Sequence, residues 1–236
     1  TRTESGLRGP RALQVEYIDC DEFAGVGVVS VASVAPLVPD DYTIVDVGGG
    51  QAPFVAQAGR CREIRVNGRR GRPGIFAQVG VSVAPPLTPG QGDFYQLAFA
   101  TTSARLAARL RALGVNARFA PRLAYRISAG DVLTIDVPRP RPYAFRIEGP
   151  IVRPDPEAPP NPLTVFNYYA QSRRAGNILQ ENAVSGIRFG QGPGVRLVAR
   201  GRRLRSIVGS APFAFPFFSA PEVFDRVELD VQPRAF

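Results

Sequence analysis

The side chains available for catalysis in this 236-residue chain are restricted. It contains no lysine, histidine, methionine or tryptophan, so all 29 basic residues are arginine. A lysine Schiff base, a histidine general base and an imidazole metal ligand are therefore excluded. The acid–base groups that remain are carboxylates, tyrosines and cysteines, and arginine can hold a carboxylate or stabilise an enolate.

One short segment brings several of these polar groups together: Asn167, Tyr168, Tyr169 and Gln171 lie within five residues. Alternate side chains of a strand point to the same face, so the segment can present amide and phenol groups to the interior of a barrel. We treat Tyr168 and Tyr169 as candidate catalytic residues and Asn167 and Gln171 as candidate substrate-binding residues. The alternative is ordinary packing with solvent-exposed tips.

Three glutamates are candidates for acid–base work: Glu63, Glu148 and Glu181. Glu148 ends a predicted strand beside Gly149, and we treat it as the candidate catalytic carboxylate. A buried carboxylate would acquire a raised pKa suited to catalysis. The alternative for each glutamate is a surface position or an ion pair.

Aromatic residues gather near the C-terminus, and Phe215 and Phe217 belong to the densest group. Its members are Phe213, Phe215, Phe217, Phe218 and Phe224. Most of them fit a core, but part of the group could line an apolar pocket. We therefore treat Phe215 and Phe217 as candidate substrate-binding residues.

The two cysteines, Cys20 and Cys61, cannot complete a structural zinc site without histidine. No metal and no cofactor is expected. A disulfide is an alternative, but the sequence favours two free, buried thiols in a cytoplasmic chain.

The elements that must position these residues are mostly strands. Leu13, Val15 and Tyr17 alternate with polar residues, as in a half-buried strand, and short apolar runs recur between proline and glycine turns. The predicted strands are residues 12–19, 25–34, 42–47, 62–66, 74–84, 94–99, 118–127, 132–137, 143–148, 163–170, 185–189, 195–199 and 227–231.

Only one helix is clearly predicted, over residues 101–114. Ser103 or Thr102 can cap its start, an apolar face follows, and Gly114 stands where a C-terminal glycine belongs. A turn of helix is also expected over residues 204–208. The pattern predicts a mainly β fold (β-rich α+β), as an antiparallel cone-like β-barrel or two packed sheets with one or two short helices.

The charge of the chain is strongly positive, at +9. Six arginines lie within residues 60–72 and five within residues 196–205, beside apparent hairpins. Nucleic acid is an unlikely partner, since no recognition helix or basic tail accompanies them, and a GC-rich coding sequence accounts for the arginines.

The chain is expected to be a single cytoplasmic domain over residues 1–236. No apolar run is long enough to cross a bilayer, and residues 1–6 lack a signal-peptide core. The proline-rich residues 150–162 fit a surface loop. Strand edges and the aromatic C-terminal segment make a homodimer reasonable.

The order of elements resembles the acetoacetate decarboxylase superfamily. Residues 39–42 (Pro-Asp-Asp-Tyr) resemble its entrance to an early strand, residues 94–99 the strand before its helix, and residues 101–114 that helix. The resemblance implies a cone-like antiparallel barrel with a helix against it. Residues 113–118 lie where the family carries its catalytic lysines, but Ala117-Arg118 stands in their place.

The resemblance implies a changed reaction, because arginine cannot replace the Schiff-base lysine. It implies a lysine-independent lyase, cyclase or isomerase acting on a carbonyl-containing or polyketide-like molecule in bacterial secondary metabolism. It places Arg118 near the family's site as a candidate catalytic residue, and a strand period of two puts Arg126 on the same face as a substrate-binding residue. The alternatives are a non-catalytic small-molecule-binding protein and a basic structural or nucleic-acid-associated protein.

Overall fold

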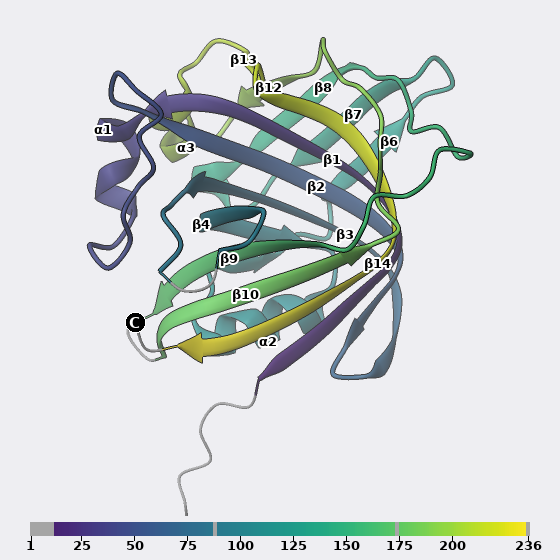
Figure 1. The fold of residues 1–236 in the computed structure, drawn as a ribbon, viewed down its shortest axis with the longest axis horizontal. Helices are drawn as coiled ribbons and strands as arrows, with labels where there is room; N and C mark the ends of the chain where they lie inside the picture. The colour runs from purple at the N-terminus through teal and green to yellow at the C-terminus, as the bar shows by residue number, and fades with distance from the viewer. Residues whose placement is uncertain (1–11, 87–88, 173–174, 235–236) are drawn as a thin grey trace, which may run out of the picture.

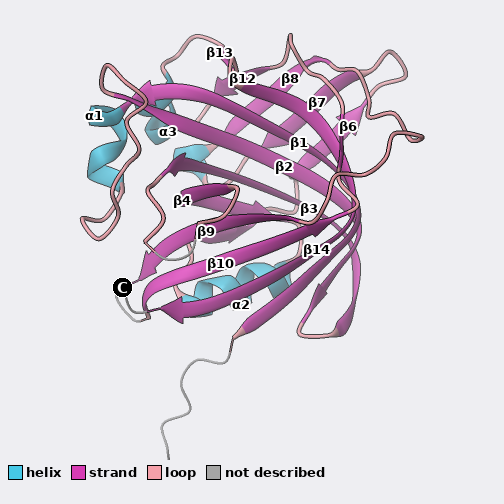
Figure 2. Cartoon of the chain, viewed as in Figure 1, coloured by secondary structure: helices cyan, strands magenta, loops and turns pink. Residues whose placement is uncertain are grey.

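The computed structural model describes residues 12–86, 89–172 and 175–234, and strands dominate it (Figures 1 and 2). Seven strands form a closed barrel in the order β1-β2-β3-β4-β9-β10-β14, and β14 pairs with β1 to close it. All neighbours are antiparallel except β4 and β9. The predicted mainly β class and cone-like barrel are confirmed.

The strands differ greatly in length, and the long ones wrap the barrel. They are β1 (Leu13–Ser30), β2 (Gln51–Val66), β3 (Arg69–Ser82), β4 (Gly92–Thr101), β5 (Ala117–Phe119), β6 (Ala124–Ile127), β7 (Val132–Val137), β8 (Phe145–Pro150), β9 (Thr164–Ser172), β10 (Gly176–Ser185), β11 (Arg188–Phe189), β12 (Arg196–Ala199), β13 (Phe213–Ala214) and β14 (Phe218–Arg234). The helices are α1 (Val31–Val34), α2 (Ala104–Leu113) and α3 (Arg202–Val208), with 3-10 turns η1 (Ala35–Leu37) and η2 (Arg141–Tyr143).

A second sheet, in the order β13-β12-β8-β7-β6, packs against the outside of the barrel wall. Phe23 and Phe54 of the barrel meet Leu133 and Ile147 of this sheet in one apolar core. The barrel interior holds a second core. Strands β1 to β3 are thus covered on both faces, which explains why their sequences show so little alternation.

Several strand predictions are wrong in their limits. The expected strands 12–19 and 25–34 are one strand, β1, whose buried face changes at Asp19 (φ 48°), and α1 follows it. Residues 42–47 contribute only an isolated bridge at Ile44. The expected strand 118–127 is divided between β5 in the barrel sheet and β6 in the second sheet, because Pro121 lacks the N–H that a ladder needs.

The predicted helix is confirmed as α2. The Ser103 hydroxyl accepts a hydrogen bond from the Leu106 N–H at 3.3 Å, and Gly114 ends the helix at φ 99°. Its buried leucines, including Leu106 and Leu110, pack into the interior core with Tyr17. Figure 1 shows α2 behind β10 and β14, at the end of the barrel away from the second sheet. The predicted turn over 204–208 is confirmed as part of α3.

Gly114→Ala is expected to lower the free energy of unfolding by about 2–4 kcal/mol, because it combines a strained φ with a clash. An added Cβ would lie 2.0 Å from the Ser172 Cβ. Gly68→Ala, at φ 66° with nothing within 4 Å, is the control and should lose only about 1 kcal/mol. Urea unfolding measures both, and equal losses would show that the contact with Ser172 is unimportant.

The expectation of free cysteines is wrong. Cys20 and Cys61 form a disulfide, with their Cα atoms 4.0 Å apart. They are directly opposite each other on antiparallel β1 and β2, which places the thiols within bonding distance. Both residues are buried in the interior core.

Among the described residues, every helix is too short or too polar to span a bilayer. Residues 1–6, on which the signal-peptide argument depended, lie outside the described ranges.

Candidate active site in the barrel interior

Each of the seven barrel strands places at least one polar side chain toward the barrel interior. All of these side chains are buried except that of Gln57, which is half-buried. We call this set the polar layer: Glu22 (β1), Gln57 (β2), Gln78 (β3), Gln96 (β4), Tyr168 (β9), Gln180 (β10) and Glu222 (β14). Three pairs of its members lie directly opposite each other on neighbouring strands, so the strand register creates the layer.

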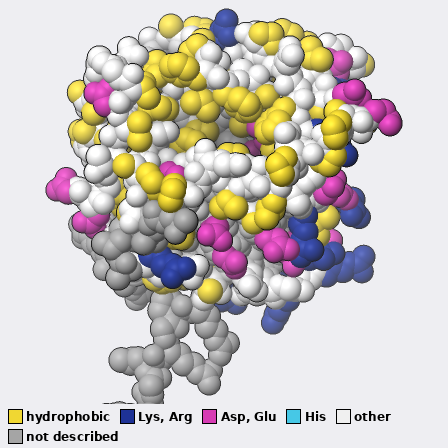
Figure 3. Space-filling model, viewed as in Figure 1, with side chains coloured by type: hydrophobic (Ala, Val, Ile, Leu, Met, Phe, Trp, Pro, Cys, Tyr) yellow, Lys and Arg dark blue, Asp and Glu magenta, His cyan; other side chains and the backbone are white. Residues whose placement is uncertain are grey.

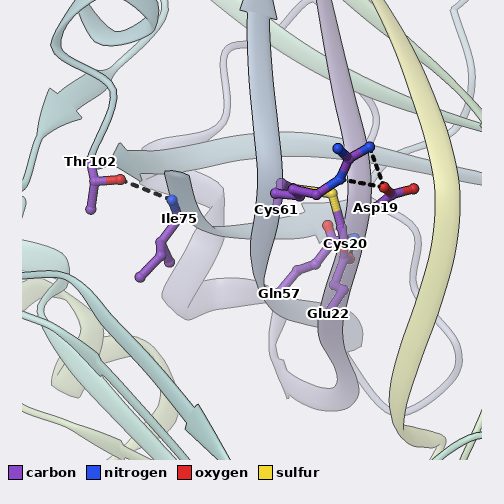
Figure 4. The surroundings of a disulfide bond; sticks show 8 residues. Asp19, Cys20, Glu22, Gln57, Cys61, Ile75 and Thr102 are labelled. Atoms are coloured by element: carbon purple, nitrogen blue, oxygen red, sulfur yellow. Dashed lines mark hydrogen bonds and ion pairs between the residues drawn. A yellow bond between two sulfur atoms is a disulfide. The ribbon is translucent and has the colours of Figure 1, made fainter. Parts of the chain in front are cut away.

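Hydrogen bonds join most of the polar layer into one chain. The Gln180 amide donates to Gln96 Oε1 at 3.2 Å, Gln96 donates to Gln78 at 2.6 Å, and Gln78 donates to Gln57 at 2.6 Å. The Gln57 amide then donates to the Glu22 carboxyl. Figure 4 shows Glu22 and Gln57 next to the disulfide, on neighbouring strands. All the glutamines are thereby satisfied in a buried environment.

The chain of amides ends at a pair of buried carboxyls. Glu22 and Glu222 occupy directly opposed positions on β1 and β14 and are only 2% and 6% exposed. Among the described residues, no arginine forms an ion pair with either carboxyl, and no group forms a hydrogen bond with Glu222. Two carboxylates cannot both ionise cheaply in such a place.

Burial therefore changes the acidity of both groups. Desolvation raises the pKa of Glu22 to about 8, although the hydrogen bond from Gln57 opposes this. Desolvation and then the charge of Glu22 raise the pKa of Glu222 well above its usual value. Near neutral pH the pair therefore retains a proton, and it titrates as a unit.

Tyr168 supplies a phenol beside the carboxyl pair. Its hydroxyl donates to Gln57 Oε1 at 2.5 Å, and its ring stacks on Phe94 with centroids 5.5 Å apart. Burial, followed by the charges of Glu22 and Glu222, raises its pKa well above the usual value. Tyr168 therefore stays protonated and acts as a hydrogen-bond donor.

A narrow cavity of about 40 Å3 lies against the polar layer. Asn182 of β10 adds an amide to its lining, and the remaining walls are mostly apolar: Tyr17, Phe76, Phe99, Phe166, Val184, Ile187, Phe224, Val227 and Leu229. Figure 3 shows hydrophobic side chains gathered around a hollow on this face of the molecule. An apolar pocket with a few convergent polar groups is the usual form of a small-molecule site.

The structure brings only Tyr168 of the predicted site residues to this cavity. Tyr169 points to the opposite face of β9, where its hydroxyl donates to Asp93 at 2.9 Å, and Asn167 donates to the same carboxylate at 3.0 Å. Gln171 contacts Asp41 and Asn177.

The other predicted site residues lie outside the barrel interior. Glu148, on β8 of the second sheet, pairs with Arg146 at 2.7 Å. Arg118 and Arg126 are exposed on β5 and β6, in different sheets. Phe215 packs on Phe23 in the core between the sheets, and Phe217 is 63% exposed.

The carboxyl pair and the glutamines were missed by sequence reasoning. A usable signal existed for the glutamines: Gln57, Gln78 and Gln96 each stand alone within an apolar strand segment. A lone amide in a segment buried on both faces needs a partner, and three such segments together indicate a shared network. Among the described residues, no group of three Cys, Asp or Glu side chains is arranged to hold a metal ion.

No family model and no curated protein matches the sequence. Solved structures do match. A structure of acetoacetate decarboxylase superposes with a TM-score of 0.59 at 11% identity, over 95% of this chain and 89% of the other. The chain has the acetoacetate decarboxylase fold.

Two enzymes of the same fold match comparably. An acetoacetate decarboxylase-like enzyme from Sphingomonas wittichii RW1 gives a TM-score of 0.54 at 10% identity, over 98% of this chain and 95% of that one. The enduracididine biosynthesis enzyme MppR, complexed with pyruvate, gives a TM-score of 0.54 at 12% identity, over 97% of this chain and 91% of that one.

The segment that resembles the lysine region of acetoacetate decarboxylases has a structural role here. Val115 is buried, and the Asn116 amide donates to the Leu97 carbonyl at 2.8 Å. Arg118 follows on the surface. This segment therefore ties the end of α2 to β4, and the reactive groups of the interior are carboxyls and a phenol.

Proposed function

We propose that the chain is an enzyme that moves protons on a small carbonyl compound without a lysine adduct, as a lyase, cyclase or isomerase. The observation that carries this is the buried carboxyl pair, Glu22 and Glu222, beside an interior cavity and without a cationic partner among the described residues. Perturbed carboxyls in a cavity are typical of acid–base sites. A layer with only a structural role could consist of amides alone, because hydrogen-bonded amides avoid the free-energy cost of burying two ionisable carboxyls.

The carboxyl pair and Tyr168 would divide the work between them. Glu22, the member of the pair that ionises as the pH approaches its pKa of about 8, removes a proton from the carbon next to the substrate carbonyl. The protonated member and the Tyr168 phenol donate hydrogen bonds to the carbonyl oxygen as it gains negative charge. Return of the proton to another carbon completes an isomerisation, and its delivery to a leaving hydroxyl completes a dehydration.

The substrate is expected to be small, since the cavity measures about 40 Å3. Pyruvate is a reasonable first probe, because MppR of the same fold is complexed with it. Because MppR is a biosynthetic enzyme, we also propose a biosynthetic role for this chain.

Proton exchange provides the test. The protein is incubated in D2O with pyruvate, other short α-keto acids and β-diketones, and the loss of C–H signals is followed by proton NMR. Glu222→Gln is expected to slow the exchange by about 10²–10⁴-fold, and Tyr168→Phe by about tenfold. Glu228→Gln is the matched control, because Glu228 is exposed on the same strand and pairs with Arg226.

Two results would contradict the proposal. The first is an exchange rate that Glu222→Gln and Glu22→Gln leave unchanged. The second is loss of exchange in Glu148→Gln alone, which would place the chemistry on the second sheet.

A further inference from the structure

A groove lined by arginine runs along the outer surface, away from the barrel interior. Arg118 of β5, Arg139 and Arg141 of the β7–β8 connection, and Arg203 of α3 border a hollow of about 520 Å3. A second hollow of about 610 Å3 continues it past Arg202 and shares Arg141 and Arg203 with the first. We call these five arginines and the space between them the arginine groove.

The positive charge of the groove is not neutralised by the protein. No aspartate or glutamate lines either hollow among the residues that the structure describes. The ion pairs found within the described ranges involve other arginines, such as Arg60 with Asp21 and Arg65 with Glu63. Clustered guanidinium groups repel each other, so an anion in the groove would relieve that repulsion.

The groove is also partly ordered in advance. Prolines 138, 140 and 142 restrict the β7–β8 connection, which turns through η2 (Arg141–Tyr143). The half-buried Tyr143 of this connection and Arg203 of α3 line the same hollow, so the two elements lie against each other there. Restricting the groups before binding lowers the entropy lost when a ligand is held.

We propose that the arginine groove binds a small ligand that carries two or more adjacent phosphate groups. Guanidinium forks match phosphate oxygens in pairs, and several of them along one groove match several phosphates in a row. Each hollow has the volume of a small-molecule site. Tyr143 is the one aromatic ring among the described lining residues, so the groove offers no platform for stacking successive bases of a strand.

Calorimetric titration of the full chain with inorganic tripolyphosphate tests the proposal. Arg118→Ala/Arg141→Ala is expected to weaken binding by about tenfold or more, because two charge-assisted contacts are lost. Arg69→Ala/Arg72→Ala, at the exposed β2–β3 hairpin, removes the same charge elsewhere and should change the affinity by less than about twofold. Arg118→Lys/Arg141→Lys keeps the charge and should lose part of the affinity, since lysine cannot form the fork.

Three different results would contradict the proposal that the groove binds a small phosphate ligand. Equal weakening in the groove and hairpin variants would show only a general attraction of anions to a basic protein. Citrate bound as tightly as tripolyphosphate would overturn the assignment to phosphate. A single-stranded oligonucleotide whose affinity increases with length, with weak tripolyphosphate binding, would overturn the assignment to a small ligand. None of these measurements depends on the barrel interior, so they test the arginine groove independently of the proposed enzyme activity.

Discussion

Glu22→Gln is expected to stabilise the protein above about pH 8, by roughly 2–5 kcal/mol, and to change its stability little near pH 4. The folded-state pKa of Glu22 is raised to about 8 by burial, whereas the unfolded chain titrates near the ordinary value of 4.5. The folded state therefore favours the protonated carboxyl. Stability is fully present below the unfolded pKa and is lost as pH rises toward the folded pKa. Glutamine carries no ionisable proton and escapes this loss.

Urea unfolding of wild type and variant across this pH range measures the effect. Glu228→Gln, on the exposed face of β14, is the control and should not reproduce the pH-dependent gain. If Glu22→Gln changed the stability equally at every pH, folding would not shift the pKa of Glu22, and the carboxyl pair would lose its role as a proton holder.

Removal of the disulfide by Cys20→Ala/Cys61→Ala should lower the free energy of unfolding by about 2–4 kcal/mol, because the bond closes a long loop in the unfolded chain. The two cysteines are 41 residues apart in sequence. Unfolding is measured with and without dithiothreitol. Wild type should lose stability in the reductant, and the double variant, which has no thiols, should be unaffected by it.

A wild type whose stability is the same with and without reductant, while its thiols are shown to be free, would contradict the prediction. The alanine variant then separates the covalent bond from packing, since any loss that remains arises from the two vacated side-chain positions.

The local elements were largely predictable from sequence. The capped helix α2, for example, depends on signals within a few residues: Ser103 at its start and Gly114 at its end. Strand limits failed where both faces are buried, as in β1, because alternation disappears there. Periodicity also could not show that Pro121 sends β5 and β6 to different sheets.

The site was predictable only in part. Tyr168 was found because its segment concentrates polar groups. Glu22 was overlooked because Asp19 and Asp21 flank it, and such an acidic run looks like a solvated face. Its partner Glu222 is 200 residues away in sequence, and only the closure of β1 on β14 brings the two together. Pairings of this kind are set by topology, which a local pattern does not contain.

The amides of the polar layer have a consequence for communication within the barrel. Each glutamine donates through nitrogen and accepts through oxygen, so the orientation of one amide fixes that of the next, from Gln180 on β10 to Glu22 on β1. When Glu22 gains a proton, it becomes able to donate to Gln57, and the neighbouring dipoles then favour reversal as a group. The ionisation of Glu22 is thereby expected to change the polarity of the amides around the barrel as far as Gln180 on β10, on the other side of β14 from β1.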